Sequence, residues 1–418
     1  MFYHIFELSL VKSGTNNYLK WRDYVGPGSV PNNPFGYAYF VPAYGAGYSY
    51  VVTGKNLLYS FNSTGGLLWT FTSGKSVNSY YYTFRSSPVV GNDGTIYLTA
   101  NSASNFYSNM ATVYAVNSAG KTKWQYNVGT NAFYNPFGSF GGDFVLASPA
   151  VASDGTVYVG VVHAPTSYSD LRINASLHSI NSLGARKWTV TPCLRTDLYP
   201  IDLSPVIGPD GTVYVAPHCL SAISSSGKIK WNYSNGNKFL PLVTVAPSDV
   251  SVVYVSQEDG QIFALRAADG TVKWTVNTGS QINSSPVVHQ DGTLFVGSAV
   301  NNLLLAYSPT GALKWIFKTD SPIHAPLTLD LSGLVYLSSD NGTIYALTSA
   351  GLQRWAYATG DSTGIGLAVT ADGGTVFAQS GSLAFFGEYG DYYLYCIRPP
   401  TGIATSLRLG QGTLGRLV

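Results

Sequence analysis

A fixed spacing from glycine to tryptophan runs through this chain and limits its fold to a repeat. Seven of the eight tryptophans lie four residues after a glycine and close a segment of the same design. From Trp231 onward they recur every 40 to 43 residues, which is the period of a four-stranded propeller blade and not of a helical repeat. Function must then come from segments that depart from the repeat. The seven residues are Trp69, Trp124, Trp188, Trp231, Trp274, Trp315 and Trp355.

Each repeat consists of short strands joined by tight turns. Runs such as Val213-Tyr214-Val215 and Leu294-Phe295-Val296 are β-branched or aromatic and too short for helices, so they predict strands. Asp154-Gly155-Thr156 is one of several Asp-Gly pairs that favour a hairpin, because glycine accepts a positive φ. The glycine before each tryptophan predicts the next hairpin and places the tryptophan on the outermost strand. Strand alternation then turns the indole toward a neighbouring blade.

The repeat resembles the PQQ-like (pyrroloquinoline-quinone-type) propeller repeat. Its clearest copy combines Ser285-Pro286-Val287-Val288, Asp291-Gly292-Thr293-Leu294-Phe295-Val296, Ala306-Tyr307 and Gly311 to Trp315. This family includes quinoprotein dehydrogenases and non-enzymatic relatives such as an outer-membrane assembly lipoprotein. The resemblance covers roughly residues 37 to 402. It implies an all-β propeller, whereas activity has to be argued from a site.

Counting the repeats predicts one domain over residues 1–418, an eight-bladed propeller of four-stranded antiparallel blades. Residues 366–402 hold the early strands of the eighth blade, and 403–418 form a tail. Ile5-Phe6-Glu7-Leu8 and Lys20-Trp21 resemble the late strands of a blade, so residues 1–23 are expected to close the ring and hide its sheet edges. Seven blades with terminal extensions is the alternative. Within 37–358, the seven complete units are 37–72, 85–128, 147–190, 203–235, 240–278, 283–318 and 323–358.

Composition excludes some partners and favours a location. Charged residues make up 11% of the chain, the net charge is +2, and no cluster of Lys and Arg occurs, which argues against nucleic acid and anionic membranes. No run approaches the roughly 18 apolar residues of a membrane span, so no transmembrane segment is expected. A neutral surface rich in its 31 tyrosines fits an extracellular or cell-surface protein. The first residues do not form a signal peptide, so the chain is either cytoplasmic or part of a longer secreted precursor.

Cysteines and sequons give two further expectations. Cys193 follows an outer strand and Cys219 follows the second strand of the next blade, and both connections emerge on one face of a meander. The two thiols either form a disulfide or stay buried and free, whereas Cys396 is expected in the core. Five Asn-x-Ser/Thr sequences are either N-glycosylation sites or chance matches in a chain rich in these residues. They begin at Asn62, Asn174, Asn232, Asn283 and Asn341.

Long, aromatic-rich connections distinguish the N-terminal half. The segments 73–86, 100–111, 129–147, 161–175 and 191–203 should all open on one face of the disc. Their rings are expected to contact a protein partner or another copy of the chain, to stack on carbohydrate, or to form small cores under the loops. The candidate binding residues are Tyr80, Tyr81, Tyr82, Phe84, Phe106, Tyr107, Phe133, Tyr134, Phe137, Phe140 and Tyr168, with Phe144 beside them.

The sequence offers no catalytic constellation. Quinoprotein dehydrogenases of this resemblance carry a quinone, a calcium-binding acid, a catalytic aspartate and commonly an adjacent cysteine pair, but no adjacent cysteines occur here. His163, His218 and His324 could reach the loop-bearing face, yet each belongs to a different blade, so no metal and no cofactor are expected. Three functions remain: a non-catalytic extracellular scaffold or assembly subunit, a glycan-binding propeller, and a PQQ-dependent oxidoreductase.

Overall fold

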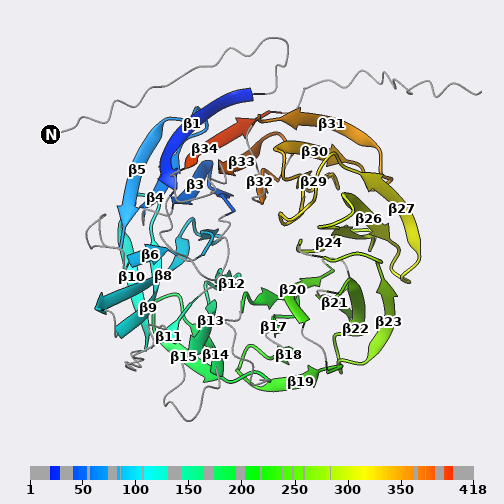
Figure 1. Ribbon diagram of the computed structural model, residues 1–418. Coiled ribbons are helices and arrows are strands. Elements are labelled where there is room, and N and C mark those ends of the chain that lie inside the picture. Colours follow the sequence, from blue (N-terminus) through cyan, green and yellow to red (C-terminus); the bar gives the residue numbers. More distant parts are fainter. Residues whose placement is uncertain are drawn as a thin grey trace, which may run out of the picture.

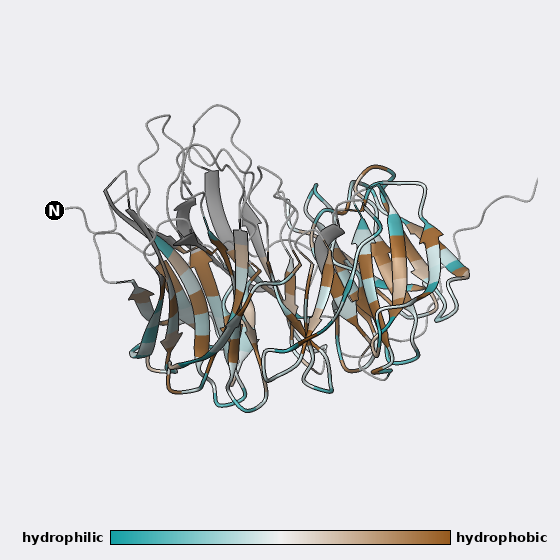
Figure 2. Ribbon diagram, turned by 90° about the horizontal axis from the view of Figure 1, so that it is seen from below, coloured by the Kyte–Doolittle hydropathy of each residue, from teal (hydrophilic) through white to brown (hydrophobic). Residues whose placement is uncertain are grey.

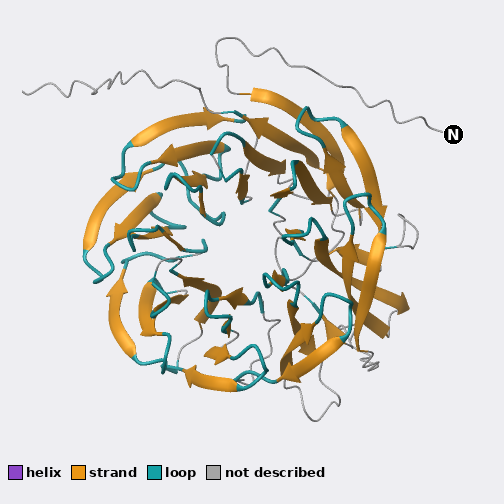
Figure 3. Ribbon diagram, turned by 180° about the vertical axis from the view of Figure 1, so that it is seen from behind, coloured by secondary structure: helices purple, strands orange, loops and turns teal. Residues whose placement is uncertain are grey.

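The structure of the protein is a computed structural model in which the described strands form a closed ring (Figure 1). The described residues contain strands and loops, as Figure 3 shows. They comprise 19–28, 41–53, 57–73, 82–84, 86–105, 108–129, 143–145, 147–163, 174–193, 203–216, 219–236, 239–246, 249–257, 259–282, 284–360, 366–371, 373–381 and 390–398.

These residues form eight antiparallel sheets, each running from the ring centre to its rim. This confirms the eight-bladed propeller and excludes seven blades with extensions. The first four blades, from inner to outer strand, are β2 (Ala43–Gly45), β3 (Tyr48–Thr53), β4 (Leu57–Phe61) and β5 (Leu67–Thr72); β7 (Val89–Val90), β8 (Ile96–Asn105), β9 (Ser108–Val116) and β10 (Thr122–Gly129); β12 (Ala150–Val151), β13 (Val157–His163), β14 (Asn174–Ile180) and β15 (Arg186–Val190); and β16 (Val206–Ile207), β17 (Val213–Val215), β18 (Leu220–Ile223) and β19 (Ile229–Tyr233).

The next three blades repeat the same meander with short connections. Each runs outward through four consecutive strands, so neighbours in sequence are neighbours in the sheet. Their strands are β20 (Phe239–Val245), β21 (Val252–Gln257), β22 (Gln261–Arg266) and β23 (Val272–Asn277); β24 (Val287–Val288), β25 (Leu294–Gly297), β26 (Leu303–Tyr307) and β27 (Leu313–Lys318); and β28 (Thr328–Leu329), β29 (Val335–Ser338), β30 (Thr343–Leu347) and β31 (Gln353–Ala358).

The eighth blade joins the two ends of the chain. Its order is β32 (Leu367–Val369), β33 (Val376–Gly381), β34 (Gly390–Ile397) and β1 (Leu19–Gly28). Trp21 pairs with Cys396, and Gly28 pairs with Gly390. The C-terminal segment therefore supplies three strands, so the expectation that the N-terminal segment provides both late strands is wrong in this detail. Residues 5–8 lie outside the described part.

Aspartate turns fix the inner strands of the blades. In the second blade Asp93 accepts hydrogen bonds from the backbone nitrogen and the hydroxyl of Thr95, at 3.0 and 2.7 Å, while Gly94 takes a φ of 75°. Lys123 reaches across the sheet to Thr95 Oγ1 and Asp93 Oδ2, at 2.8 and 3.0 Å. Partial burial opposes ionisation, but the bonds from Thr95 and Lys123 lower the pKa of Asp93 to about 2. The predicted Asp-Gly-Thr hairpin thus has a local electrostatic cause.

Each outer-strand tryptophan described by the sequence pattern packs against the next blade. Trp124 donates to the backbone oxygen of Ser182 at 2.9 Å, and a Cβ added to Gly184 would lie 2.9 Å from its indole. The same relation links Trp231 to Ala267 and Gly270. The glycine of the Gly-x-x-x-Trp motif thus provides both a positive-φ turn and room for the preceding blade's indole. This confirms the inter-blade role predicted for the tryptophans.

The hydrophobic core lies between neighbouring sheets and follows the ring. Figure 2 shows apolar and polar residues alternating along the strands. Second-strand rings such as Tyr97, Tyr214 and Phe295 are at most 2% exposed. Burial raises the pKa of Tyr214 to about 12, with the nearby Asp210 as the next cause, so its hydroxyl stays protonated. Stacking of separate small cores makes the ring rigid enough to hold connections in fixed positions.

Candidate functional site

The ring has two unlike faces because of its meander. The turns from first to second strand and from third to fourth strand open on one face, here the turn face. The connections from second to third strand and from one blade to the next open on the other, here the loop face. The predicted asymmetry between blades lies on the loop face.

The second and third blades extend further toward the loop face than their counterparts. Strands β8 and β9 have 10 and 9 residues, whereas the equivalent β25 and β26 have 4 and 5. Residues 100–111, expected as a long connection, thus continue a hairpin through Asn105 and Ser108. Two short strands, β6 (Tyr82–Phe84) and β11 (Asp143–Phe144), add to β8 and β13 and make these sheets five-stranded.

Phe84 belongs to the core rather than to a contact surface. It is 1% exposed, lies in the apolar cluster between the first and second blades, and its ring centre is 6.3 Å from that of Phe71. Its inclusion among the binding residues is corrected, because β6 pairing turns the ring inward. Tyr82 and Phe144 lie in β6 and β11, but their side chains are not described. The other candidates, Tyr80, Tyr81, Phe106, Tyr107, Phe133, Tyr134, Phe137, Phe140 and Tyr168, lie outside the described residues.

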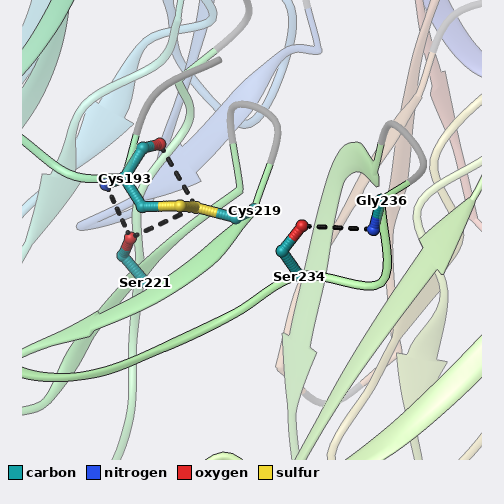
Figure 4. Close-up of a disulfide and its surroundings, with 5 residues drawn as sticks. All are labelled: Cys193, Cys219, Ser221, Ser234 and Gly236. Atoms are coloured by element: carbon teal, nitrogen blue, oxygen red, sulfur yellow. Dashed lines mark hydrogen bonds between the residues drawn. A yellow bond between two sulfur atoms is a disulfide. The ribbon is translucent and has the colours of Figure 1, made fainter.

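A disulfide joins two connections on the loop face of the fourth blade. Cys193, after β15, bonds to Cys219, before β18, with Cα atoms 6.1 Å apart (Figure 4). The backbone nitrogen of Cys193 also donates to Ser221 Oγ at 3.2 Å. Cys219 is 2% exposed. The connection after the third blade is thus anchored covalently to the fourth, while Cys396 is buried in the closing blade, as expected for a core residue.

The sequons differ in how accessible their asparagines are. Asn232 and Asn341 are exposed. Asn62 is half-buried, and its carboxamide oxygen accepts bonds from Thr64 and Gly66 within its turn. The side chain of Asn174, at the start of β14, and all of Asn283 lie outside the described part. Asn232 and Asn341 are thus more accessible to solvent than Asn62, and the carboxamide oxygen of Asn341 also accepts bonds from Ser339 and Thr343.

A cluster of polar side chains that includes Asp320 and Asp340 lies on the loop face of the seventh blade. His324 Nδ1 is 2.7 Å from Asp340 Oδ2. Asp320 accepts bonds from Ser339 and Thr343 at 2.8 Å each. Partial burial opposes ionisation, but hydrogen bonds led by that from Asn341 hold the pKa of Asp320 at about 2. These contacts join the connection before β28 to the connection between β29 and β30.

A second polar group lies between the second and third blades, and sequence reasoning missed most of it. His163 Nε2 and His178 Nε2 lie 2.7 and 2.9 Å from the same Ser176 hydroxyl. Tyr126 Oη lies 3.0 Å from His178 Nδ1. His178 and Ser176 are 3% and 4% exposed. The sequence signal was the histidine itself, because blades with a comparable ring contact carry an aromatic residue at the position of His178.

The donors present do not fit a quinone dehydrogenase site. The three cysteines are not adjacent, and the described disulfide spans a sequence separation of 26 residues at the edge of the fourth blade. Among the described side chains, no three His, Cys, Asp or Glu come together as a metal site would require. His218 lies outside these residues, and His163 and His324 belong to blades three and seven.

No helix in the part of the chain that is described is long and apolar enough to cross a membrane.

Comparison with known proteins places the repeats in one family. A model of the PQQ-type repeat family described as outer membrane protein assembly factor BamB matches residues 21–160, 173–288 and 259–402. The assembly factor BamB of Yersinia pestis is 29% identical over 124 residues, which are 28% of this chain and 31% of that protein. The serine/threonine-protein kinase AfsK of Streptomyces griseus is 29% identical over 162 residues, covering 37% of this chain and 19% of that protein. The chain thus spans less than two thirds of either relative.

Solved structures share the fold at low sequence identity. The quinohemoprotein alcohol dehydrogenase from Comamonas testosteroni has a TM-score of 0.61 and 13% identity, covering 91% of this chain and 78% of that one. A europium-containing methanol dehydrogenase has a TM-score of 0.62 and 12% identity, covering 90% and 93%. At these identities the likeness shows the propeller alone. Because the family match extends through all eight blades, the chain belongs to the PQQ-type repeat family described as outer membrane protein assembly factor BamB.

Proposed function

We propose that this propeller is a non-catalytic scaffold that binds a protein partner through the loop face of its first four blades. The observation that carries the proposal is the unequal height of the blades: β8 and β9 of the second blade have 10 and 9 residues, against 4 and 5 in β25 and β26 of the sixth. A ring of equal blades needs no such extension for its own stability.

The family supports a role in assembly. The Yersinia pestis relative is named as an assembly factor for outer membrane proteins. For this chain the analogous role is to hold a partner on a rigid ring, with binding residues in connections between fixed strands. The aromatic residues at 80–82, 106–107 and 133–140 are of the type whose large apolar rings commonly dominate protein interfaces. Phe84 is not among them, since it is buried.

Two observations support a location outside the cytoplasm. The Cys193–Cys219 disulfide fixes a loop-face connection, and disulfides persist chiefly in oxidising compartments. Asn232 and Asn341 are exposed within sequons. The disulfide and the exposed sequons both favour a cell-surface or exported scaffold over a cytoplasmic one.

The test is a comparison of two triple variants in the full chain. Tyr81→Ser, Phe106→Ser and Phe133→Ser together remove loop-face rings. Leu183→Ser, Leu331→Ser and Leu352→Ser together remove apolar side chains from the turn face, where these leucines are 83%, 72% and 60% exposed. The leucine set is the matched control because it changes exposed apolar residues on the opposite face. The threonines of the Asp-Gly-Thr turns on that face would not serve, because they are buried and hydrogen-bonded. Tagged chains are purified from the source cells and their bound proteins are quantified.

The expected result is loss of a specific bound protein in the loop-face variant, with retention in the turn-face variant and equal melting temperatures. A loop-face variant that melts earlier but keeps its partners would show that the rings are local core, and the proposal would fail. Binding to a glycan array that disappears in the same variant would instead support the carbohydrate function. Dye reduction after adding calcium and pyrroloquinoline quinone would overturn the non-catalytic assignment.

A further inference from the structure

The outermost strand of each blade, here called its rim strand, has one edge that no described strand pairs with. A rim strand pairs only with the third strand of its own blade. Natural sheets protect such edges with charged side chains, above all lysine, because an unprotected edge can pair with a further strand. Seven of the eight rim strands contain lysine or arginine: β1, β10, β15, β19, β23, β27 and β31. The exception is β5 of the first blade, which lies on the rim of the ring in Figure 1.

The composition of β5 favours pairing with another strand. Its six residues, Leu67-Leu68-Trp69-Thr70-Phe71-Thr72, include no charged residue, no proline and no glycine. Leu67 and Leu68 are 38% and 47% exposed, and Thr70 and Thr72 are also exposed. Short segments of high β-propensity and low charge are those that associate strand to strand when an edge is open. The first blade therefore presents an unprotected edge.

The missing charge in β5 belongs to a larger change in the first blade. In the second blade Lys123, just before the repeat tryptophan, lies 3.0 Å from Asp93, just before the positive-φ glycine of the inner turn. The first blade has Leu68 and Ala46 at these two positions. Both members of the ion pair are thus replaced by apolar residues, so the inner turn supplies no aspartate to hold a basic residue at this edge.

We propose that β5 pairs antiparallel with β5 of a second copy of this chain. Charge favours a second copy as the occupant, because any other rim strand paired with itself would bring like charges together, whereas β5 has none. Such a contact joins the two four-stranded first blades into one continuous sheet across a two-fold axis. The edge lies on the rim, so this contact is independent of the partner proposed for the loop face.

The register of the pair follows from the alternation of side chains. Residues directly opposite in an antiparallel pair point to the same face of the sheet, so one residue at the axis must pair with its own copy. Thr70 is the central residue in this arrangement. It places Trp69 opposite Phe71 and Leu68 opposite Thr72, and the exposed leucine side chain leaves water on association.

The experiment measures the mass of the full chain in solution by sedimentation equilibrium over a range of concentrations, together with the melting temperature. Thr70→Lys introduces a charge at the axis. Thr275→Lys is the matched control, because Thr275 is an exposed threonine directly after the tryptophan of β23, a strand that already contains Lys273. Leu68→Lys is a second variant, and its fold is safeguarded because five other blades carry lysine at that position.

The expected result is a dimer that dissociates on dilution. Thr70→Lys and Leu68→Lys should each weaken it by about tenfold or more, since each places two like charges at the paired edges. Thr275→Lys should dimerise as the unaltered chain does, and all melting temperatures should agree when compared as monomers. A chain that is monomeric at every concentration, a dimer that persists in both edge variants, or equal weakening by Thr275→Lys overturns the proposal.

A cysteine at the axis tests the register directly. Under mild oxidation Thr70→Cys should give a disulfide-linked dimer on a gel without reductant, whereas Thr275→Cys should stay a single chain. The native cysteines do not compete, because Cys193 and Cys219 are bonded to each other and Cys396 is buried. A linked dimer in both variants, or in neither, overturns pairing through β5.

Discussion

The indole nitrogen of Trp274 donates a 2.8 Å hydrogen bond to the backbone oxygen of Pro309 in the next blade. Corresponding bonds run from Trp188 to Ser225 and from Trp315 to Ser349. The motif that identifies the repeat is therefore also the contact that joins one repeat to the next. Stability of such an array depends on these nearest-neighbour interfaces.

Removing a tryptophan should weaken one interface in proportion to its burial. Trp231 is 9% exposed, so Trp231→Ala is expected to cost about 3 kcal/mol or more of unfolding free energy. Trp274 is only half-buried, and Trp274→Ala should cost less. Chemical denaturation of both variants measures the difference, with Trp231→Phe as the variant that keeps a ring but loses the hydrogen bond. Equal losses for both alanine variants would contradict this ranking.

Removing the closing strand should open the ring. Deleting residues 1–28 takes away β1, which pairs with β34 from Leu19 with Ile397 to Gly28 with Gly390. The loss of a whole strand interface is expected to cost several kcal/mol and to expose the edge of β34 for association. Melting temperature and size-exclusion chromatography measure both effects. Deleting only residues 1–18 retains β1, so that shorter deletion should stay monodisperse and melt near the unaltered chain.

Acid should destabilise the protein as the turn aspartates become protonated. The pKa of Asp93 is about 2 in the folded chain, below its usual value of about 3.9. A carboxyl with a lowered folded pKa contributes its stabilisation above the unfolded pKa and loses it as the pH falls to the folded pKa. Unfolding free energy should therefore fall between about pH 4 and pH 2, and less steeply in Asp93→Asn. The effect is limited because the side chain of Asp93 is about half exposed to solvent. Identical pH curves for the two proteins would show that Asp93 does not contribute to the acid sensitivity.

Reducing the disulfide should loosen the loop face of the fourth blade. A bond that closes a sequence separation of 26 residues is expected to stabilise the fold by about 3 kcal/mol, because it restricts the unfolded chain. Denaturation with and without a phosphine reductant measures this contribution. The double variant Cys193→Ala with Cys219→Ala should be insensitive to reductant. A reductant effect that persists in the double variant would point to a different cause.

Local chemistry made most of the ring predictable. Asp-Gly-Thr turns and Gly-x-x-x-Trp hairpins each depend on neighbouring residues. Gly311, for example, takes a φ of 85° in its hairpin and also leaves room for the indole of Trp274. The order of the closing blade depended instead on distant pairing. Sequence likeness suggested two N-terminal strands, but β34 already occupies the third place.

The candidate sites were less predictable for the same reason. Phe84 belongs to a segment that reads as a loop until β6 pairs with β8 and buries it. Tyr126 and His178 are 52 residues apart in sequence and meet only because neighbouring blades stack. Most predicted aromatic contact residues lie outside the described part, so their role stays a prediction.

The pairing of β1 with β34 also determines when the ring can close during synthesis. The ribosome makes Leu19 long before its pairing partner Ile397. At elongation rates of about 5–20 residues per second, β1 remains unpaired for on the order of 20 s or longer before β34 is synthesised. During that interval seven blades can assemble in succession while an open edge remains at each side of the growing arc. Chaperones or export factors that bind such unpaired strand edges would therefore act before β1 pairs with β34, because the closed ring no longer exposes those edges.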